Sequence, residues 1–528
     1  MCNIVRNYGG YHPAAGGSII ADELLVCAGS NTMASDDTSV GLVALGGLGE
    51  IGMNCLALEA EGKILVVDCG VMFPSPDEPG VDVIHPSFEH LVAARDRICG
   101  IVLTHGHEDH AAGVPYLLRE IDVPVYGGPY ALALVERRFK ESGGVGRFVP
   151  RAVAVGGSAS IGPFRVQSFS LPHSIAENTG LVIEAGLFRI LHTGDFKLGL
   201  CAADFGRAAL ERLAEMSAPG ADLMICDSTG AEEPSPSGEE SAVEAHLAEL
   251  ALETKGAVFA AVFSSNTMRM ASLFEAARRS GRRVAFAGRS VETHAEVAAS
   301  QGVLTLPRQL LVSLEEIADV RREELLVVAA GTQGEDRSAL SRIASGEHRQ
   351  LGVRPGDLVV LSSRFIPGNE LAISRMIDKL LRSGARVVHR GNDPGVHVSG
   401  HGSAREIEEA VRAVRPKAFL AAHGTYRHMT AASEIARRAG VAASLAVSNG
   451  DLVRVTASGV AVSRGFAETG RVMIDGESSV PEAAMKERRL LGSRGLLHAV
   501  WRADPDGFIE GEAEIVARGV IADEALLW

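Results

Sequence analysis

The stretch Thr104-His105-Gly106-His107-Glu108-Asp109-His110 decides how the rest of the sequence is interpreted. Its side chains that can bind a metal ion are His105, His107, Asp109 and His110. The apolar run before the stretch predicts a strand and the residues after it predict a helix, so one turn can direct all four groups into one cavity. Imidazole and carboxylate groups suit zinc or manganese. A polar loop with chance histidines is the alternative, but the H-x-H-x-D-H spacing favours a metal site.

Further candidate ligands each follow a predicted strand, where open α/β sheets build their sites. They are His173 after strand 165–169, Asp195 after strand 188–191, and His423 after strand 418–421. A carboxylate has two oxygens to share, so Asp195 can bridge two metal ions. A single histidine at a strand end is usually structural, and His192 is interpreted in that way.

Residues 46–52 contain a Gly-x-Gly-x-x-Gly pattern, and Asp68 lies where a dinucleotide-binding acid would stand. That fingerprint must open a helix whose N-terminus holds a pyrophosphate, whereas residues 54–60 and 63–67 predict two strands. We therefore expect a tight turn that brings backbone close to the metal cavity. Asp68 itself is a candidate to orient a ligating histidine through the free ring N–H, with a loop-capping carboxylate as the alternative.

The composition bounds the class of protein. The chain has 528 residues, of which 46% are hydrophobic and 22% charged, as in globular proteins of two to four domains. Its net charge of -15 counts against a nucleic-acid partner unless a local basic groove or metal ions attract one. The seven cysteines are scattered and form no C-x-x-C, which indicates a reducing cytoplasm. No apolar run is long enough to span a bilayer, so no membrane partner is expected.

The order of predicted elements divides the chain into parts. Residues 1–38 are expected to be a flexible extension. The remaining parts alternate strands and helices, and a second doubly wound unit interrupts the first. We predict a first domain in two pieces, 39–230 and 385–450, an inserted domain, 231–384, and a linker with a C-terminal segment, 451–528.

The inserted domain also carries the most basic stretch of the sequence. Its arginines are Arg269, Arg278, Arg279, Arg282, Arg283 and Arg289. A nucleic-acid patch and a solvated helix face are both left open as interpretations.

The constellation resembles the metallo-β-lactamase superfamily. The insertion, with Asp227-Ser228-Thr229 and Ser399-Gly400-His401, resembles its β-CASP branch of nucleic-acid hydrolases and, within that branch, the ribonuclease J family. The supporting stretches are 68–74, 104–110, 192–197, 332–335, 338–342, 366–370 and 397–403. The resemblance runs from about Gly41 to Ile515. It implies an α/β fold: an αββα sandwich with an inserted β-CASP α/β domain and a short, truncated C-terminal α+β segment.

The resemblance implies a role for each site residue. One divalent metal ion would be bound by His105, His107 and His173, and a second by Asp109, His110 and His423. Asp195 would bind both ions. Zinc is expected, with manganese or magnesium as alternatives. Asp68 and Asp227 would orient the ligands. His401 would contact the scissile phosphate and protonate the leaving oxygen, acting in catalysis with Asp195 and Asp109. The residues that would seat RNA phosphates are His397, Val398, Ser399, Gly400, His401, Phe263, Ser264 and Ser265.

The activity implied is metal-dependent hydrolysis of single-stranded RNA that leaves 5′-phosphates. It would combine 5′→3′ exonuclease action on 5′-monophosphorylated RNA with endonuclease action, in rRNA maturation and mRNA decay in the cytoplasm. A homo-oligomer, a dimer, is implied, although the short C-terminal segment puts it in doubt. Some members hold a structural calcium ion near the counterparts of Asp82 and Asp475. This sequence departs from the family at Gly230, usually Asn, and at Thr425, usually an acid.

Three other functions compete with this interpretation. A small-molecule metallohydrolase acting on a thioester or lactam explains the opening motif but not the inserted domain. A DNA nuclease of the β-CASP branch differs only in lacking the stretches typical of ribonuclease J. A non-catalytic RNA-binding subunit would have lost ligands, whereas all seven are present here.

Overall fold

A computed structural model describes residues 39–75, 77–199, 203–366, 368–504, 506 and 509–519. The predicted flexible extension, residues 1–38, lies outside the described residues. No helix in the described ranges combines the length and the apolar character needed to cross a membrane.

The first of two large sheets has eight strands in the order β23-β22-β1-β3-β4-β6-β7-β8. Their bounds are β1 (Ser39–Gly46), β3 (Cys55–Ala60), β4 (Lys63–Val67), β6 (Ile98–Val102), β7 (Val125–Gly127), β8 (Pro150–Ala152), β22 (Leu452–Thr456) and β23 (Gly459–Ser463). Strands β4, β6, β7 and β8 run parallel, so their carboxyl ends meet at one edge. The short helices α1 (Glu89–Ala93), α2 (Glu108–Ala111) and α3 (Val114–Leu117) and the longer α4 (Pro129–Glu141) belong to the connections.

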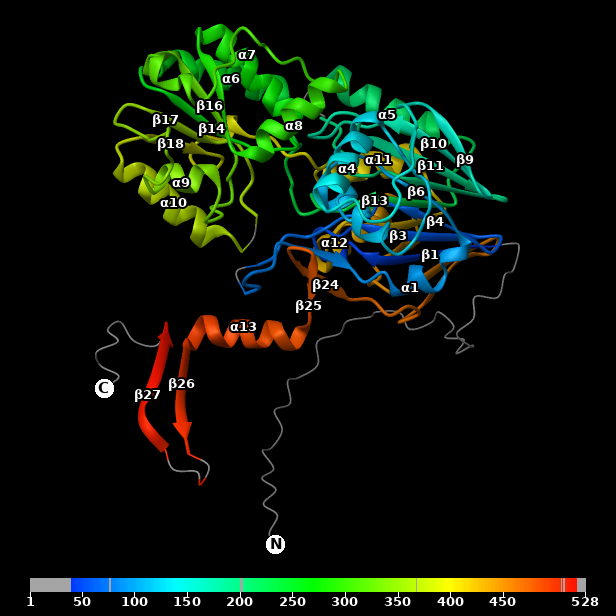
Figure 1. The fold of residues 1–528 in the computed structure, drawn as a ribbon. Coiled ribbons are helices and arrows are strands. Elements are labelled where there is room, and N and C mark those ends of the chain that lie inside the picture. Colours follow the sequence, from blue (N-terminus) through cyan, green and yellow to red (C-terminus); the bar gives the residue numbers. More distant parts are fainter. Residues whose placement is uncertain are drawn as a thin grey trace, which may run out of the picture. The chain divides into compact units, whose positions relative to one another are not determined.

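The second large sheet has seven strands in the order β21-β19-β13-β12-β11-β10-β9. Their bounds are β9 (Ser158–Ile161), β10 (Phe164–Ser170), β11 (Thr179–Ala185), β12 (Phe188–His192), β13 (Leu223–Asp227), β19 (Ala418–Ala422) and β21 (Ala443–Leu445). One apolar core joins the two sheets to the helices α5 (Ala203–Ser217), α11 (Ala404–Val414) and α12 (Tyr426–Arg438). Two facing sheets with outer helices are the predicted sandwich (Figure 1).

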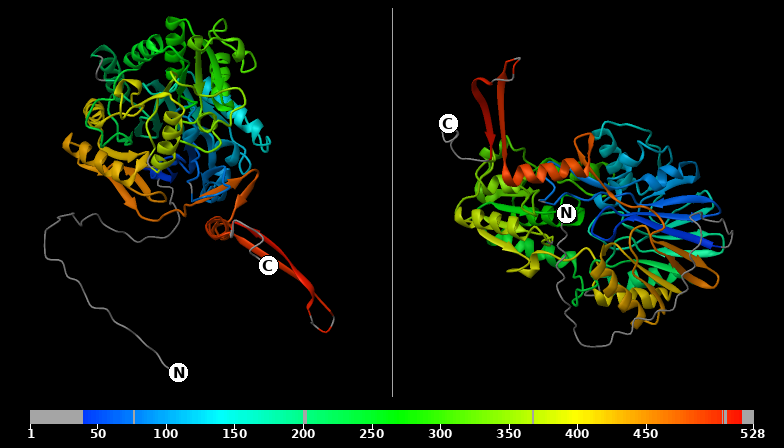
Figure 2. Two further views of the ribbon diagram at one scale, coloured as in Figure 1. Left: turned by 90° about the vertical axis from the view of Figure 1, so that its left-hand side faces the viewer. Right: turned by 90° about the horizontal axis from the view of Figure 1, so that it is seen from below.

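A third sheet of five parallel strands makes up the inserted unit, in the order β15-β16-β14-β17-β18. The strands are β14 (Val258–Ala261), β15 (Arg283–Ala287), β16 (Leu325–Ala329), β17 (Leu358–Leu361) and β18 (Arg386–His389). The helices α6 (Glu240–Glu253), α7 (Thr267–Ser280) and α8 (Arg289–Ser300) pack on one face, and α9 (Ala339–Ala344) and α10 (Glu370–Arg382) on the other. In the right-hand view of Figure 2, the green to yellow-green ribbons of these elements lie to one side of the blue strands of the first large sheet. Because β18 pairs with β17, the inserted sheet extends past the expected boundary at residue 384.

The chain leaves the second sheet after β13 and returns to it at β19, and these strands are parallel neighbours. A buried carboxylate, Glu406, ties the crossing segments together. It accepts hydrogen bonds from the N–H groups of Leu198 (3.1 Å) and Gly199 (2.7 Å) and from Ser237 Oγ (2.7 Å). It also caps α11 through the N–H of Ser403 at 2.8 Å. This one side chain thus holds together three segments: the loop before α5, the segment that enters the insert and the segment that returns from it.

The basic stretch of the insert is not a single surface patch. Arg269 and Arg282 are fully buried. Arg269 binds Glu240 and the carbonyl of Val396, and Arg282 donates to backbone carbonyls, including that of Ala251 at 2.9 Å. For these two arginines neither of the two open interpretations holds, because their guanidinium groups bind acceptors in the interior of the inserted unit and face neither a nucleic acid nor solvent.

The segment after β23 contributes two strands of a three-stranded sheet, a helix and a hairpin. The sheet consists of β24 (Arg471–Asp475), β25 (Ser478–Val480) and β5 (Val83–Pro86); the helix is α13 (Glu482–Arg494), and the hairpin is β26 (Leu496–Ala503) with β27 (Ile509–Arg518).

The two carboxylates expected near a calcium ion lie in this region and have protein partners. Asp475 Oδ2 accepts from Arg488 at 2.7 Å, and Asp82 Oδ2 accepts from the N–H of Gly476 at 2.8 Å. Neither belongs to a metal-competent cluster of the described residues. A structural calcium ion near these two residues stays a prediction.

Candidate metal centre

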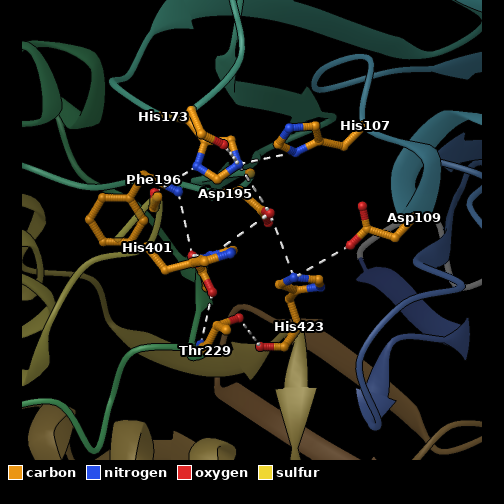
Figure 3. Close-up of polar contacts among 12 residues, drawn as sticks. His107, Asp109, His173, Asp195, Phe196, Thr229, His401 and His423 are labelled. Atoms are coloured by element: carbon orange, nitrogen blue, oxygen red, sulfur yellow. Dashed lines mark hydrogen bonds and ion pairs between the residues drawn. The ribbon is translucent and has the colours of Figure 1, made fainter. Parts of the chain in front are cut away.

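The seven predicted metal ligands converge on one centre where the two large sheets meet the returning chain. They form two groups that share Asp195, and within each group the potential ligand atoms lie within 4.8 Å of one another. The first group is His105, His107, His173 and Asp195, and the second is Asp109, His110, Asp195 and His423. Figure 3 shows His107 and His173 of the first group and Asp109 and His423 of the second group around Asp195.

The loop after β6 is held in place by the backbone that follows β4. Cys69 N–H donates to the carbonyl of His110 at 2.7 Å, and Val71 N–H donates to that of Glu108 at 3.0 Å. Gly70 permits this close approach, because a Cβ at that position would lie 1.7 Å from the carbonyl oxygen of Asp109. The Asp68-Cys69-Gly70 stretch therefore fixes the direction of the ligand-bearing turn.

The glycine-rich turn of residues 46–52 also lies at this centre. Its short strand β2 (Leu48–Gly49) pairs with β20 (Gly424–Thr425), directly after His423. This confirms the expectation of a tight turn near the metal cavity in place of a nucleotide loop. His192, interpreted as structural, accepts the N–H of Gly194 at 2.8 Å and so shapes the turn that carries Asp195.

The donor set of the first group fits a divalent metal ion. His107 Nδ1 lies 3.0 Å from His105 Nε2 and 3.2 Å from His173 Nε2. A tetrahedral ion with bonds of about 2.0 Å separates its ligand atoms by about 3.3 Å. Burial lowers the pKa of His105 and His107 well below the usual range and that of His173 to about 4, so the imidazoles are in the neutral form that binds metal.

The second group has an excess of negative charge that a cation would offset. Burial by itself would lower the pKa of His110, but the carboxylates of Asp195, Asp109 and Asp68 raise it well above its usual range. Asp195 Oδ1 is buried and lies 3.3 Å from His110 Nε2, and Asp195 Oδ2 lies 3.6 Å from the Nε2 atoms of His173 and His423. A carboxylate that contacts ligands of both groups suits a position between two ions.

Outer partners fix the orientation of three ligand rings, which leaves each Nε2 toward the centre. His110 Nδ1 donates to Asp68 Oδ2 at 2.8 Å, and His173 Nδ1 donates to the carbonyl of Gly400 at 2.6 Å. His423 Nδ1 donates to Asn54 Oδ1 at 2.9 Å. Such contacts set the tautomer of a ligating histidine. The placement of Asp68 supports its expected role, and Asp68 also binds Thr104 N–H at 2.8 Å.

Asn54 is a site residue that the sequence did not reveal. Its side chain contacts His423, His110 at 3.1 Å and the carbonyl of Asp109 at 3.0 Å. It stands just before β3, and no motif distinguishes it from any polar residue at the start of a strand. The side-chain amide of Asn54 is thus the partner of His423 Nδ1. Thr425, where this sequence departs from the family pattern, pairs with Gly49 in the β2–β20 ladder.

His401 lies on the side of the centre opposite the turn that carries Asp109. Its Nδ1 is 2.8 Å from Asp227 Oδ2 and 3.9 Å from Asp195 Oδ2. Burial disfavours the charged ring, but the charge of Asp227 and its hydrogen bond outweigh burial and raise the pKa of His401 to about 9. The imidazolium can therefore hold a proton at neutral pH. The carboxylate of Asp227 also accepts the N–H of Thr229 at 2.9 Å.

The expected phosphate-binding residues fall into two loops. In the loop before α11, Ser399 Oγ accepts the N–H of His401 at 3.0 Å, and His397 is buried with no hydrogen-bond partner on Nδ1 among the described residues. Burial and the nearby Arg269 lower the pKa of His397 to about 3. Phe263, Ser264 and Ser265 follow β14, where Ser264 Oγ donates to Ser290 Oγ at 2.8 Å. The two remaining predicted residues, Val398 and Gly400, lie within the first loop, and a Cβ at Gly400 would lie 3.0 Å from the ring of His173.

Close packing explains why a glycine stands at position 230, the other departure from the family pattern. A Cβ at this position would lie 2.2 Å from the carbonyl oxygen of Gly402. The glycine therefore lets the strand exit after Asp227 approach the loop that carries His401.

Three family models match consecutive parts of the chain. Residues 48–255 match the metallo-beta-lactamase superfamily, residues 255–380 match "Ribonuclease J, beta-CASP domain", and residues 387–445 match "Zn-dependent metallo-hydrolase RNA specificity domain". The chain is also similar in fold to a solved structure titled as a protein of unknown function from Enterococcus faecalis, with a TM-score of 0.52 at 13% identity over 73% of this chain and 94% of that one.

Curated relatives extend the similarity over most of the sequence. Ribonuclease J of Mycolicibacterium smegmatis is 37% identical over 92% of this chain and 87% of its own length, and that of Mycobacterium tuberculosis is 39% identical over 86% and 82%. Ribonuclease J of Corynebacterium glutamicum is 38% identical over 86% of this chain, which spans 64% of that protein. With the two-group metal centre and the inserted parallel sheet, these matches show that the chain belongs to the ribonuclease J family of metal-dependent ribonucleases.

Proposed function

We propose that this chain hydrolyses phosphodiester bonds of single-stranded RNA, as a 5′→3′ exonuclease on 5′-monophosphorylated ends and also as an endonuclease, leaving 5′-phosphates. The observation that carries the proposal is the pair of ligand groups that share Asp195, with His401 beside them. A phosphodiester needs a nucleophile on one side and a proton for the leaving oxygen on the other, and this arrangement offers a place for both.

Each side chain of the centre has a defined task in this proposal. His105, His107 and His173 would hold one divalent ion, and Asp109, His110 and His423 the other. We propose zinc, with manganese or magnesium as alternatives, because histidine and carboxylate ligands suit these ions. When bound, such a pair of ions supplies a water activated near neutral pH and neutralises charge on the phosphate.

His401 is the proposed proton donor to the leaving 3′ oxygen. Its Nδ1 is engaged by Asp227, so Nε2 is the nitrogen left to meet a substrate. The Asp227 carboxylate fixes the ring direction and stabilises the imidazolium. Asp195 and Asp109 complete the catalytic set by holding the reacting centre together.

The loop from His397 to His401, with Phe263, Ser264 and Ser265, is proposed to seat the phosphates of the RNA strand. Gly400 supports this placement, because its carbonyl accepts from the metal-group residue His173. A phosphate bound here would lie next to the reacting centre, so a terminal 5′-phosphate could set the position of the cut. Backbone contacts suit a nuclease that trims RNA of any sequence.

The cellular setting and the assembly are proposed on separate observations. The described cysteines Cys55, Cys69, Cys99 and Cys226 are all free, as expected in a reducing cytoplasm. Leu497 and Trp501 of β26 expose about half of their side chains, which supports a homodimer contact through the C-terminal segment. We further propose roles in rRNA maturation and mRNA decay.

The test uses 5′-monophosphorylated RNA, the same RNA with a 5′-triphosphate, and DNA of matching sequence, each incubated with the purified chain and added zinc or manganese. We expect mononucleotides from the monophosphorylated RNA, internal fragments from the triphosphorylated RNA and no cleavage of DNA. Failure to cut either RNA with either metal would refute the proposal, and preferential cutting of DNA would reassign the enzyme to DNA.

A further inference from the structure

We propose that Arg364, Arg390 and Arg427 form a track for the phosphates of single-stranded RNA beside the metal centre, and that Glu232 and Glu233 occupy this track until RNA displaces them. The inference rests on the proposed function and adds to it a binding surface with a built-in competitor. The three arginines are called the arginine track below.

Two adjacent acids hold three arginines from separate parts of the fold. Glu233 lies 2.9 Å from Arg364 Nη2 and 3.6 Å from Arg390 Nη2, and Glu232 lies 2.8 Å from Arg427 Nε. The acids stand on the segment that enters the insert after β13. Arg364 follows β17, Arg390 follows β18, and Arg427 is in the first turn of α12. The pairs therefore bridge the inserted unit and the two-sheet sandwich.

The arginine track adjoins the metal centre. His428, one residue beyond Arg427, has Nε2 3.7 Å from Glu232, and a Cβ on Gly424, next to His423, would lie 3.4 Å from its Nδ1. On the other side, the carbonyl of Glu233 accepts the N–H of Ala404 at 3.0 Å, three residues after His401. A strand whose scissile phosphate reaches the metal ligands would therefore pass within reach of these guanidinium groups.

The track is accessible to solvent, which makes its ion pairs easy to exchange. The side chains of Arg364, Arg390 and Arg427 are 43%, 45% and 70% exposed. Exposed carboxylate–arginine pairs contribute little net stability, whereas a guanidinium can bind a phosphate through two parallel hydrogen bonds. This sets the track apart from Arg269 and Arg282, whose buried contacts belong to the folded interior.

The surroundings favour RNA as the ligand. Gln333 Nε2 donates to the carbonyl of Arg364 at 2.9 Å, and Gln333 Oε1 accepts the N–H of Ile366 at 2.8 Å, so the backbone that presents Arg364 is fixed. Tyr426, next to Arg427, is 55% exposed and offers a ring on which an unpaired base can stack. In a chain with a net charge of -15, such a local basic track is where a polyanion can dock, and its two acids keep it partly neutral when no RNA is bound.

The experiment measures binding of an oligouridylate of about ten nucleotides, a length within the reach of such grooves, by fluorescence anisotropy over a series of salt concentrations. It uses the full chain with EDTA present, so that the RNA is not cut. For Arg364→Gln, Arg390→Gln and Arg427→Gln we expect weaker binding, with the slope of log affinity against log salt reduced by about 0.7 for each lost contact. For Glu233→Gln we expect roughly two- to fivefold tighter binding, because the competing carboxylate is gone.

A matched control lies outside the insert, on α5. Arg212 and Glu215 form the same kind of exposed pair at 2.8 Å. Arg212→Gln and Glu215→Gln should leave both the affinity and the salt slope unchanged. Thermal unfolding of every variant shows whether the fold is kept.

The outcomes separate this inference from the proposed function. Weaker binding by Glu233→Gln would overturn it, because the acid would then act as a structural bridge. Unchanged salt slopes in the three arginine variants would overturn it as well. Cleavage of RNA by the unsubstituted chain with zinc or manganese is scored separately. A chain that cuts RNA but shows no effect of these substitutions retains its proposed function and loses only the arginine track.

Discussion

His401 Nδ1 lies 2.8 Å from Asp227 Oδ2, although 174 residues separate the two in sequence. Asp227 is the last residue of β13, and His401 precedes α11 by a few residues. One hydrogen bond therefore joins the residue after which the chain enters the inserted unit to the loop by which the chain returns from it. Through this bond, the position of the inserted unit is coupled to the residue proposed to donate the proton.

Replacing His401 with alanine should remove the proton donor and leave the metal ligands in place. We expect turnover of 5′-monophosphorylated RNA to fall by about 10²- to 10⁴-fold, the usual contribution of a general acid. The metal content, measured by mass spectrometry of the purified protein, should stay near that of the unsubstituted chain. Loss of metal would show that His401 is a ligand, as its place in a third metal-competent group with Asp195, Asp227 and His423 allows.

Asp195 is shared by both ligand groups, whereas His107 belongs to one. Asp195→Ala should therefore lower the occupancy of both metal positions, and His107→Ala should lower mainly one. Chelation of the unsubstituted chain should abolish RNA cleavage, and zinc or manganese should restore it. Equal metal loss in the two variants would contradict the shared position of Asp195.

Gly70 allows the backbone after β4 to contact the turn that carries Asp109 and His110. Gly70→Ala would place a methyl group 1.7 Å from the carbonyl of Asp109, so the turn must move. We expect a loss of about 1–3 kcal/mol in the free energy of unfolding, as for other overpacked sites, together with weaker metal binding. Gly352→Ala is the control, because a Cβ there meets no atom within 4 Å. Normal metal affinity in Gly70→Ala would show that the turn can relax.

Glu406 should contribute to stability in a pH-dependent way. Burial opposes its charge, but hydrogen bonds from Ser403, Ser237 and Gly199 outweigh burial and lower its pKa in the folded chain. A lowered pKa stabilises the fold above the unfolded value of about 4.3, and this stabilisation is lost as the pH falls through the folded value. Glu406→Gln should therefore cost about 2–4 kcal/mol at neutral pH, where hydrogen bonds to the charged group are lost.

Denaturant unfolding at several pH values tests this, with Glu408→Gln on the same helix as the control. Glu408 forms a surface pair with Arg412, so its substitution should change the free energy of unfolding by about 0.5 kcal/mol or less. The difference in the free energy of unfolding between Glu406→Gln and the unsubstituted chain should shrink as the pH falls below about 4.3. A deficit that stays constant across this range would show that the carboxylate charge plays no part.

The sequence by itself predicted the candidate ligands and the class of fold. His105, His107, Asp109 and His110 are close because they share one turn, and the strand-end positions of His173, Asp195 and His423 follow from a local alternation of apolar and polar residues. Both are short-range patterns, so they can be read without coordinates. The tight turn at residues 46–52 was predicted for the same reason, since two strands follow it in place of a helix.

Only the tertiary structure decided what surrounds those ligands. Asn54 forms a hydrogen bond with His423, which is 369 residues away in sequence, and Glu406 forms one with Gly199, which is 207 residues away. No local pattern distinguishes such residues, because their roles depend on which distant backbone and side-chain atoms the fold brings within hydrogen-bond distance. The arginines show the same limit. Arg269 and Arg364 are the same residue type in the same inserted unit, yet burial assigns the first to the interior and exposure leaves the second free to exchange its carboxylate for a phosphate.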